Sequence, residues 1–292
     1  MCTLCTIILT KNEEKDIEGA VQSAWQCSDE VLVVDSGSTD RTVELAKYND
    51  ARVVYRAWDN DFASQRNFAL TQTDAKWVLY LDADERMDLQ LTDEINKIVA
   101  GSAPADLQES SGAPVISPAN RDIPAASPES NGAPATIPAN KTGLKQFSMQ
   151  RKSVAFGKKF SYGPLHPDWV TRLFPRESMT WTGKVHEHPE CSLPLEKLPG
   201  HLEHYTYRNW QEWEEKMARY STLWAEEAYH KGRRASLPEA LLHGIGSLFS
   251  TLLLRLGFLD GWMGICLCCM YFSYTMLKYL KLYGLQQGDT EL

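Results

Sequence analysis

The sequence predicts an α/β fold in which a doubly wound, mostly parallel sheet carries helices on both faces. Short apolar runs alternate with amphipathic segments of helical length along the first hundred residues of the chain. These apolar runs are nearly continuous, as is typical of strands that are buried on both faces. Strands that alternate with helices of this length form right-handed βαβ units, and such units build a doubly wound sheet.

Four strands and three helices are expected in this region. The strands are predicted at residues 6–10, 30–35, 51–55 and 77–81. The helices are predicted at residues 16–27, 41–48 and 62–71. Asp40 precedes the second helix, where its carboxylate can cap the free backbone amides.

Polar side chains follow three of these strands at one expected edge of the sheet. Asn12 and Glu13 follow the first strand, and Asp35 ends the second. Asp82 and Asp84 follow the fourth strand. Ligands of such sheets bind beyond the carboxyl ends of the strands, so these residues are candidates for a binding site. The sequence contains neither a dinucleotide-binding Gly-x-Gly-x-x-Gly after the first strand nor a phosphate-binding P-loop.

Asp82 and Asp84 are two residues apart, so from the end of a strand both side chains point the same way. Mg²⁺ is typically held by one or two protein carboxylates together with substrate phosphates. The pair therefore indicates a metal-bound diphosphate. A solvated turn is the alternative for this pair taken alone, and the surrounding pattern has to decide between them.

Four ordered motifs carry a resemblance to a known family. They are TKNEE at 10–14, VVDSGSTDRT at 33–42, QRN at 65–67 and LDADE at 81–85. In this order they resemble the motifs of family-2 glycosyltransferases with a GT-A fold. Within that family the sequence is most similar to bacterial lipopolysaccharide core-type β-1,4-glucosyltransferases. The resemblance covers residues 3 to about 100 and resumes from about 145 to 283.

The resemblance implies inverting transfer of a hexose, expected to be glucose from UDP-glucose, to a lipid-linked or lipopolysaccharide-core glycan. Asp84 would ligate Mg²⁺ or Mn²⁺ at the diphosphate, and Asp82 would contact the ribose or assist the metal. The residues expected to bind the nucleotide sugar are Asn12, Glu13, Asp35, Ser36, Arg66, Asp82 and Arg172.

Residues 181–189, WTGKVHEHP, place an acid between two imidazoles in a segment suited to a site loop. Surface loops also collect His and Glu by chance, but related glycosyltransferases carry a similar Gly-x-Val/Ile-His-Glu motif here. Glu187 is therefore the expected catalytic base for the acceptor hydroxyl. His186 would orient it, and His188 would complete the metal shell. Many relatives place the base in an Asp-rich motif that this sequence lacks.

The chain divides into four regions. Residues 102–143 are rich in Pro, Ala and Ser, have few large apolar residues and predict a disordered insertion. They separate a nucleotide-sugar-binding half, residues 1–101, from an acceptor-side half, residues 144–208. Residues 209–292 are expected to be helical and to associate with a membrane.

This membrane prediction comes from residues 261–277, which carry no charge over 17 positions, the bottom of the range for a spanning helix. Arg255 and Asp260 interrupt the apolar stretch before this run, and Lys278 closes it. We therefore expect two interfacial helices at the cytoplasmic face of the inner membrane, with the protein peripheral or monotopic. A buried helical hairpin or a dimer interface is the alternative.

The composition restricts the classes of binding partner and the compartment expected for the chain. The net charge of −8 argues against nucleic acid, and seven scattered cysteines fit free thiols in a reducing compartment. No secretory signal is recognised at the N-terminus, where the apolar run is short and lacks a basic segment before it. The oligomeric state stays open. Two other functions compete with the first: transfer to a polyprenyl phosphate, and noncatalytic binding of a nucleotide sugar by a scaffold.

Overall fold

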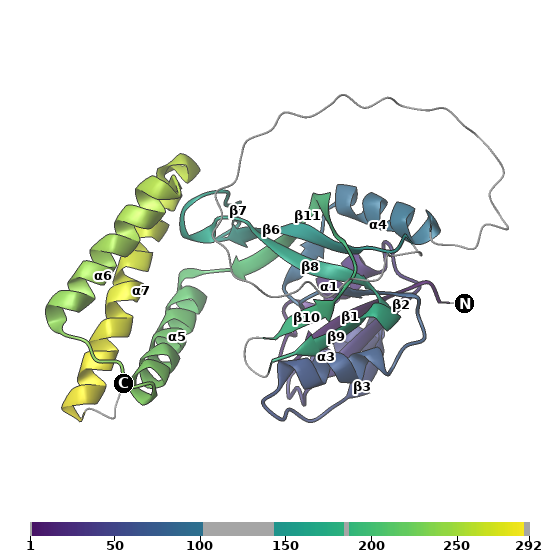
Figure 1. Cartoon of the computed structure of the whole chain (residues 1–292), viewed down its shortest axis with the longest axis horizontal. Coiled ribbons are helices and arrows are strands. Elements are labelled where there is room, and N and C mark those ends of the chain that lie inside the picture. The colour runs from purple at the N-terminus through teal and green to yellow at the C-terminus, as the bar shows by residue number, and fades with distance from the viewer. Residues whose placement is uncertain (1, 102–142, 184–186, 289–292) are drawn as a thin grey trace, which may run out of the picture.

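The computed structural model describes residues 2–101, 143–183 and 187–288 of the chain. Figure 1 shows an α/β part and, beside it, a group of long helices. The strands are β1 (Leu4–Thr10), β2 (Glu30–Asp35), β3 (Arg52–Tyr55), β4 (Trp77–Tyr80), β5 (Glu85–Met87), β6 (Gln146–Ala155), β7 (Lys158–Lys159), β8 (Asp168–Pro175), β9 (Met179–Thr182), β10 (His188–Cys191) and β11 (Leu195–Tyr207). The helices are α1 (Ile17–Ala24), α2 (Thr42–Tyr48), α3 (Phe62–Leu70), α4 (Leu89–Gly101), α5 (Trp210–His230), α6 (Leu237–Phe249) and α7 (Gly261–Gln287).

The main sheet has the order β3-β2-β1-β4-β8-β6-β11-β5, with β7 paired to β6. The first four strands are parallel, as predicted. Beyond β4 the sheet is mixed, because β8 runs antiparallel to both β4 and β6, while β6 and β11 are parallel. β8 follows β6 without a crossover helix, and a direct return of this kind gives antiparallel pairing. The predicted α/β class is confirmed, with a parallel first half and a mixed second half.

Helices cover both faces of the sheet, which explains why its strands are apolar on both sides. Leu4 and Ile8 of β1 belong to the core that includes α1 and α4. Cys5 and Ile7 alternate with them and belong to the core beneath α3. β11 passes α4 so closely that a Cβ on Gly200 would lie 2.4 Å from the Leu91 Cα. The close approach fixes α4 against β11 on one face of the sheet.

The C-terminal region is helical, as predicted, and α7 packs against both α5 and α6. Helix α6 opens with a capping box in which Ser236 and Glu239 bond reciprocally to each other's backbone amides. A π-helical turn (Ser250–Leu254) and a 3-10 turn (Gly257–Asp260) connect α6 to α7. The segments Leu237–Leu254 and Gly257–Gln287 are long and apolar enough to cross a membrane, judged by length and composition.

Two of the sequence predictions fall outside the described residues. Apart from Gly143, the predicted insertion at residues 102–143 is not among them, and neither is His186.

Candidate active site

The turn after β4 places Asp82 and Asp84 at the carboxyl edge of the parallel strands. The Asp82 N–H donates to Glu85 Oε2 at 3.0 Å, and the Glu85 N–H donates to the Asp82 carbonyl at 2.9 Å, which closes the turn. Both aspartates line one cavity of about 410 Å³, which we call the site cavity. Its lining residues are Leu9, Glu13, Phe62, Arg66, Asp82, Ala83, Asp84, Glu187, His204 and Tyr220.

Asp82 is held by two arginines. Arg172 of β8 donates to its Oδ2, and the Arg66 Nη2 lies 3.5 Å from its Oδ1. Burial alone would raise the pKa of Asp82, but Arg172 and Arg66 outweigh it and hold that pKa well below the usual range. Asp82 is therefore a fixed anion, and the two guanidinium groups already occupy its oxygens.

Arg172 joins Asp82 to a second carboxylate, that of Glu85. The Arg172 Nη2 donates to Glu85 Oε1 at 2.9 Å, and the Arg151 Nη1 lies 3.6 Å from the same oxygen. Glu85 is fully buried. Burial and the nearby charge of Asp82 raise the pKa of Glu85, although Arg172 and Arg151 oppose the shift. Arg172 was expected at the diphosphate or the acceptor; here its terminal nitrogen lies between these two acids.

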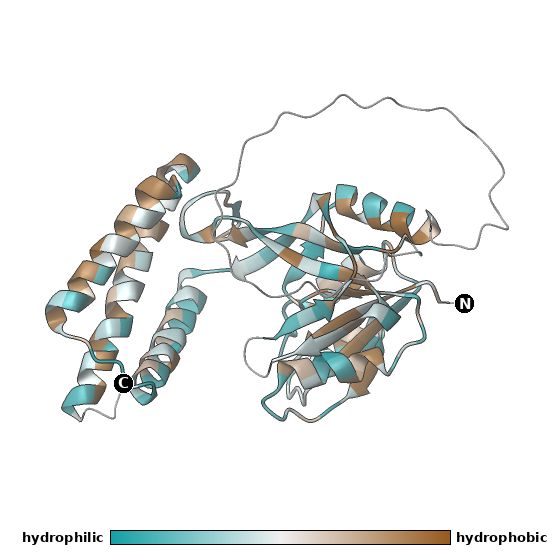
Figure 2. Ribbon diagram, in the orientation of Figure 1, coloured by the Kyte–Doolittle hydropathy of each residue, from teal (hydrophilic) through white to brown (hydrophobic). Residues whose placement is uncertain are grey.

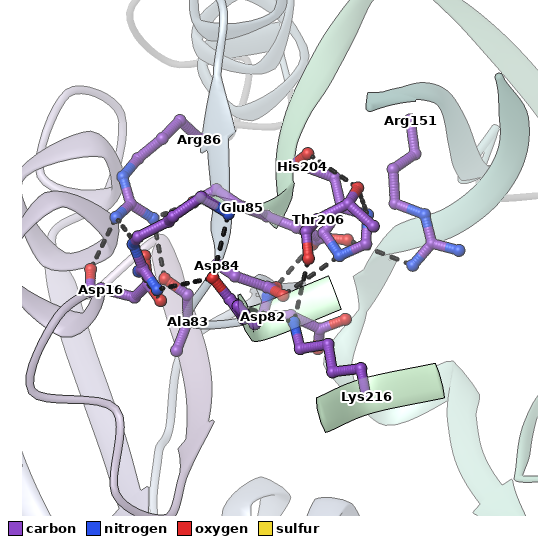
Figure 3. Close-up of polar contacts among 12 residues, drawn as sticks. Asp16, Asp82, Ala83, Asp84, Glu85, Arg86, Arg151, His204, Thr206 and Lys216 are labelled. Atoms are coloured by element: carbon purple, nitrogen blue, oxygen red, sulfur yellow. Dashed lines mark hydrogen bonds and ion pairs between the residues drawn. The ribbon is translucent and has the colours of Figure 1, made fainter. Parts of the chain in front are cut away.

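Asp84 faces a histidine that the sequence analysis missed. The Nε2 of His204, on β11, lies 3.1 Å from Asp84 Oδ2, and Figure 3 shows the two side chains together. The His204 Nδ1 lies 3.3 Å from the Thr206 hydroxyl, and the Tyr205 N–H donates to the Asp84 carbonyl at 2.8 Å. His204 follows Asp84 by 120 residues and belongs to no local motif, so only the pairing of β5 with β11 brings it here.

Asp84 and His204 offer one oxygen and one nitrogen donor to the same cavity. Two protein donors suit a divalent cation whose remaining positions are filled by phosphate oxygens and water. An imidazole donor suits Mn²⁺ better than Mg²⁺. Over residues 2–101, 143–183 and 187–288, no three His, Cys, Asp or Glu side chains form a complete metal cluster. The donor set therefore fits a cation that arrives with a diphosphate rather than a closed structural site.

Glu187 and His188, both in the predicted site loop at residues 181–189, lie in different surroundings in the structure. Glu187 lines the site cavity, with its Oε1 3.5 Å from the Arg66 Nη2. Arg66 is buried, and its guanidinium lies 4.6 Å from the centroid of the Trp181 ring. His188 lies on β10 instead, with its Nε2 3.1 Å from the Thr182 hydroxyl, and is not among the residues that line the site cavity. Arg66 thus links Glu187 to Asp82.

Glu13 lies in the wall of the same cavity. Burial, followed by the charges of Asp84 and Asp16, raises the pKa of Glu13 to about 7. The carboxyl group is therefore poised to exchange a proton near neutral pH, and a cation at Asp84 would favour its ionised form.

The other predicted nucleotide contacts organise the neighbouring loops. The buried Asp35 accepts hydrogen bonds from the backbone amides of Gly37 and Ser38 at 2.8 and 3.0 Å. The Asn12 side chain accepts from the Thr39 N–H at 2.8 Å. Ser36 lines an adjoining cavity of about 230 Å³, whose wall includes two aromatic rings, Trp58 and Phe62. This second cavity shares Leu9, Glu13 and Phe62 with the site cavity.

Comparison with known proteins identifies the class of the N-terminal third. Residues 5–101 match the family model described as glycosyl transferase family 2. This segment, which contains Asp82 and Asp84, is therefore a family-2 glycosyltransferase segment, and the resemblance noted in the sequence is confirmed over it.

Two relatives show how far the similarity extends. An uncharacterized glycosyltransferase, RT0209, of Rickettsia typhi is 43% identical over 100 residues, which is 34% of either chain. The lipopolysaccharide core biosynthesis glycosyltransferase LpsC of Rhizobium meliloti is 38% identical over 104 residues, 34% of this chain and 38% of LpsC. The chain thus matches only about a third of the length of these relatives.

A solved structure of glucosyl-3-phosphoglycerate synthase from Mycobacterium tuberculosis, in complex with Mn²⁺, UDP and phosphoglyceric acid, is 26% identical. The match covers 29% of this chain and 34% of that chain, with a TM-score of 0.26. At this TM-score the likeness supports no statement about the chemistry of this chain.

Proposed function

We propose that this chain is a metal-dependent, inverting glycosyltransferase that moves a hexose, glucose from UDP-glucose, to a lipid-linked or lipopolysaccharide-core glycan. The observation that carries the proposal is the Asp84–His204 pair, which faces the same cavity as Asp82 and Glu187 at the end of a family-2 segment. The similarity to LpsC supports the choice of acceptor class.

Asp84 and His204 would hold the divalent cation, and Asp82 would assist through water or contact the ribose. When bound, the cation stabilises the negative charge that develops on the leaving diphosphate. Arg172 keeps the Asp82 carboxylate in place through its hydrogen bond. Uridine would occupy the adjoining cavity, where Ser36 and Glu13 offer polar groups beside aromatic rings.

Glu187 would act as the general base. The acceptor oxygen attacks the anomeric carbon, its proton passes to the Glu187 carboxylate, and the bond from that carbon to the diphosphate oxygen breaks. One displacement without a covalent intermediate inverts the anomeric centre, so an α-linked donor gives a β-linkage. Arg66, at 3.5 Å, positions the carboxylate on the cavity wall.

The test uses the full chain with a panel of nucleotide hexoses in Mn²⁺ or Mg²⁺, and follows transfer and slow donor hydrolysis. Asp84→Ala and Glu187→Gln should each abolish transfer. The matched control is Glu177→Gln, because that side chain is 87% exposed and pairs only with its neighbour Arg176 among the ion pairs of the described residues. Activity that survives Asp84→Ala or Glu187→Gln would remove the role assigned to that residue.

Transfer to a polyprenyl phosphate is the second candidate, favoured by the apolar segments at the C-terminus. A phosphate acceptor needs no deprotonated hydroxyl, so Glu187→Gln would retain activity and the product would be a lipid phosphate-linked sugar. A noncatalytic scaffold would bind UDP-sugar and show neither transfer nor hydrolysis. For either enzyme we propose a site of action at the cytoplasmic face of the inner membrane.

A further inference from the structure

Helix α6 carries small residues where it packs and large apolar residues where it is exposed. Ala240 and Gly244 are buried, and a Cβ on Gly244 would lie 3.0 Å from the ring of Phe272 on α7. The Thr275 hydroxyl of α7 donates to the Ser247 hydroxyl at 3.0 Å. The exposed large apolar residues of α6 are Leu237, Leu241, Leu242, Ile245 and Phe249, and Leu253 of the following π-helical turn continues them; each of the six is between 48% and 66% exposed. We call these six residues the outer stripe.

This arrangement is the reverse of a helix on a water-soluble domain, which buries its large apolar residues and exposes polar ones. Small residues at the helix contact and large apolar residues outside are typical of helices in lipid. From residue 240 to residue 254 the sequence has no Asp, Glu, Lys or Arg. Figure 2 shows the hydrophobic colour along α6, whereas α5 is more hydrophilic.

The turn after α6 continues the apolar surface and adds positive charge at its border. Trp262, at the start of α7, is 66% exposed, and Leu254 is 69% exposed. The Lys158 Nζ of β7 lies 5.7 Å from the centroid of the Trp262 ring, and Arg255 is exposed between two exposed leucines. Basic side chains beside a tryptophan match the anionic headgroup region of a bilayer.

Neighbouring elements restrict the side from which lipid can reach the helices. The Lys281 Nζ of α7 donates to the Ala218 carbonyl of α5 at 3.0 Å, so α5 covers part of α7. The turn is fastened to the α/β part, because the Asp260 carboxylate accepts from the Tyr162 N–H at 2.9 Å, and the Gly163 N–H donates to the Arg255 carbonyl at 2.8 Å. A spanning helix would need apolar surroundings over about 30 Å of depth, whereas α5 covers part of α7 and the α/β part holds the turn before it.

We infer that α6 lies flat in the headgroup region of an anionic bilayer, immersed along the outer stripe, with Trp262, Arg255 and Lys158 at the edge of the contact. The chain is thus monotopic, held by one helix face rather than by a span. The outer stripe is thus the surface of the proposed membrane association, whether or not the chain transfers a sugar.

The test is flotation of the full chain with vesicles of phosphatidylcholine, with or without phosphatidylglycerol. The wild-type chain should float with the anionic vesicles. Leu242→Glu combined with Ile245→Glu should lower the partition coefficient about 100-fold, because two apolar side chains lose their burial. Arg255→Gln should lower it about fivefold, and only with anionic lipid. The matched control is Leu89→Glu, since Leu89 is 78% exposed on α4.

Circular dichroism and donor hydrolysis serve as controls for the fold and for the candidate site. All the substitutions are at exposed positions and should leave both measurements unchanged. Binding of the double variant equal to wild type would overturn the inference. The inference would also be overturned if the wild-type chain is a dimer that does not bind vesicles and the double variant is a monomer. A second copy of the chain would then cover the outer stripe. Brominated lipids test how deeply Trp262 enters the bilayer. The emission of Trp262 is the difference between the wild-type chain and Trp262→Phe, and bromines near the headgroups should quench it. Quenching mainly by bromines deep in the acyl chains would contradict a flat helix.

Discussion

Replacement of Arg172 by leucine should destabilise the protein by about 3 kcal/mol. Removing one partner from a buried ion pair costs roughly 3–5 kcal/mol, because the other charge is left without compensation. Glu85 is fully buried and would lose its 2.9 Å bond. The lower end of the range applies, since the Arg151 Nη1 remains 3.6 Å away and Glu85 keeps the Asp82 amide.

The loss should depend on pH with a definite sign. The pKa of Glu85 is already raised in the folded protein and should rise further without Arg172. A raised folded pKa gives stability that is complete below the ordinary glutamate value and is lost as the pH rises through the folded value. The variant should therefore recover part of its stability at pH 5 relative to pH 8.

Urea unfolding at these two pH values measures the effect. With a slope of about 3 kcal/mol per molar, the midpoint should fall by about 1 M at pH 8. Adding Glu85→Gln should return more than half of the loss, because the second carboxylate charge is gone and the amide oxygen can still accept from Asp82. The matched control is Arg41→Leu, which removes an exposed pair with Glu44 and should cost about 0.5 kcal/mol or less.

A loss of stability under about 1 kcal/mol at pH 8, or a loss that is the same at pH 5, would mean that Arg172 does not hold Glu85. A variant of unchanged stability that binds UDP-sugar poorly would instead return Arg172 to the diphosphate role first expected from the sequence.

His204→Ala should weaken Mn²⁺ binding in the presence of UDP at least about tenfold by calorimetry, and unchanged affinity would exclude it as a ligand. The pKa of Glu13 is about 7. Metal-free stability should therefore fall as the pH rises from 5 to 8, and Glu13→Gln should remove about 2 kcal/mol of that fall in thermal unfolding. Gly200→Ala should cost about 2 kcal/mol by the clash with Leu91, whereas Gly101→Ala, whose Cβ would meet no heavy atom of the described residues within 4 Å, should cost nothing measurable.

The elements that the sequence predicted well are those governed by local periodicity. Continuous apolar runs located β1 to β4, and helical spacing located α1 to α3 and α5. The carboxyl ends of parallel strands meet at one edge whatever follows in the chain, so the location of Asp82 and Asp84 could be predicted without knowing the second half of the sheet.

The partners of those aspartates could not be predicted, because they depend on the register of strands from the second half. His204 reaches Asp84 only because β11 pairs with β5, and Arg172 reaches Asp82 because β8 pairs with β4. Glu85 extends the Asp-x-Asp motif in sequence and gives no local sign of burial. Its environment comes from side chains of β6 and β8, which follow residue 143 in the chain.

The position of β5 has a consequence for synthesis of the protein on the ribosome. Among the described strands β5 pairs only with β11, at one end of the sheet. A nascent chain that ends at residue 101 can assemble β1 to β4, yet Glu85–Met87 has no strand partner, and Arg151 and Arg172 do not yet exist to neutralise Glu85. The candidate site around Asp82, Asp84 and Glu85 therefore cannot form co-translationally until residue 207 has left the exit tunnel. A truncated product of the family-2 segment should expose these residues, and protein quality control should recognise it as unfinished.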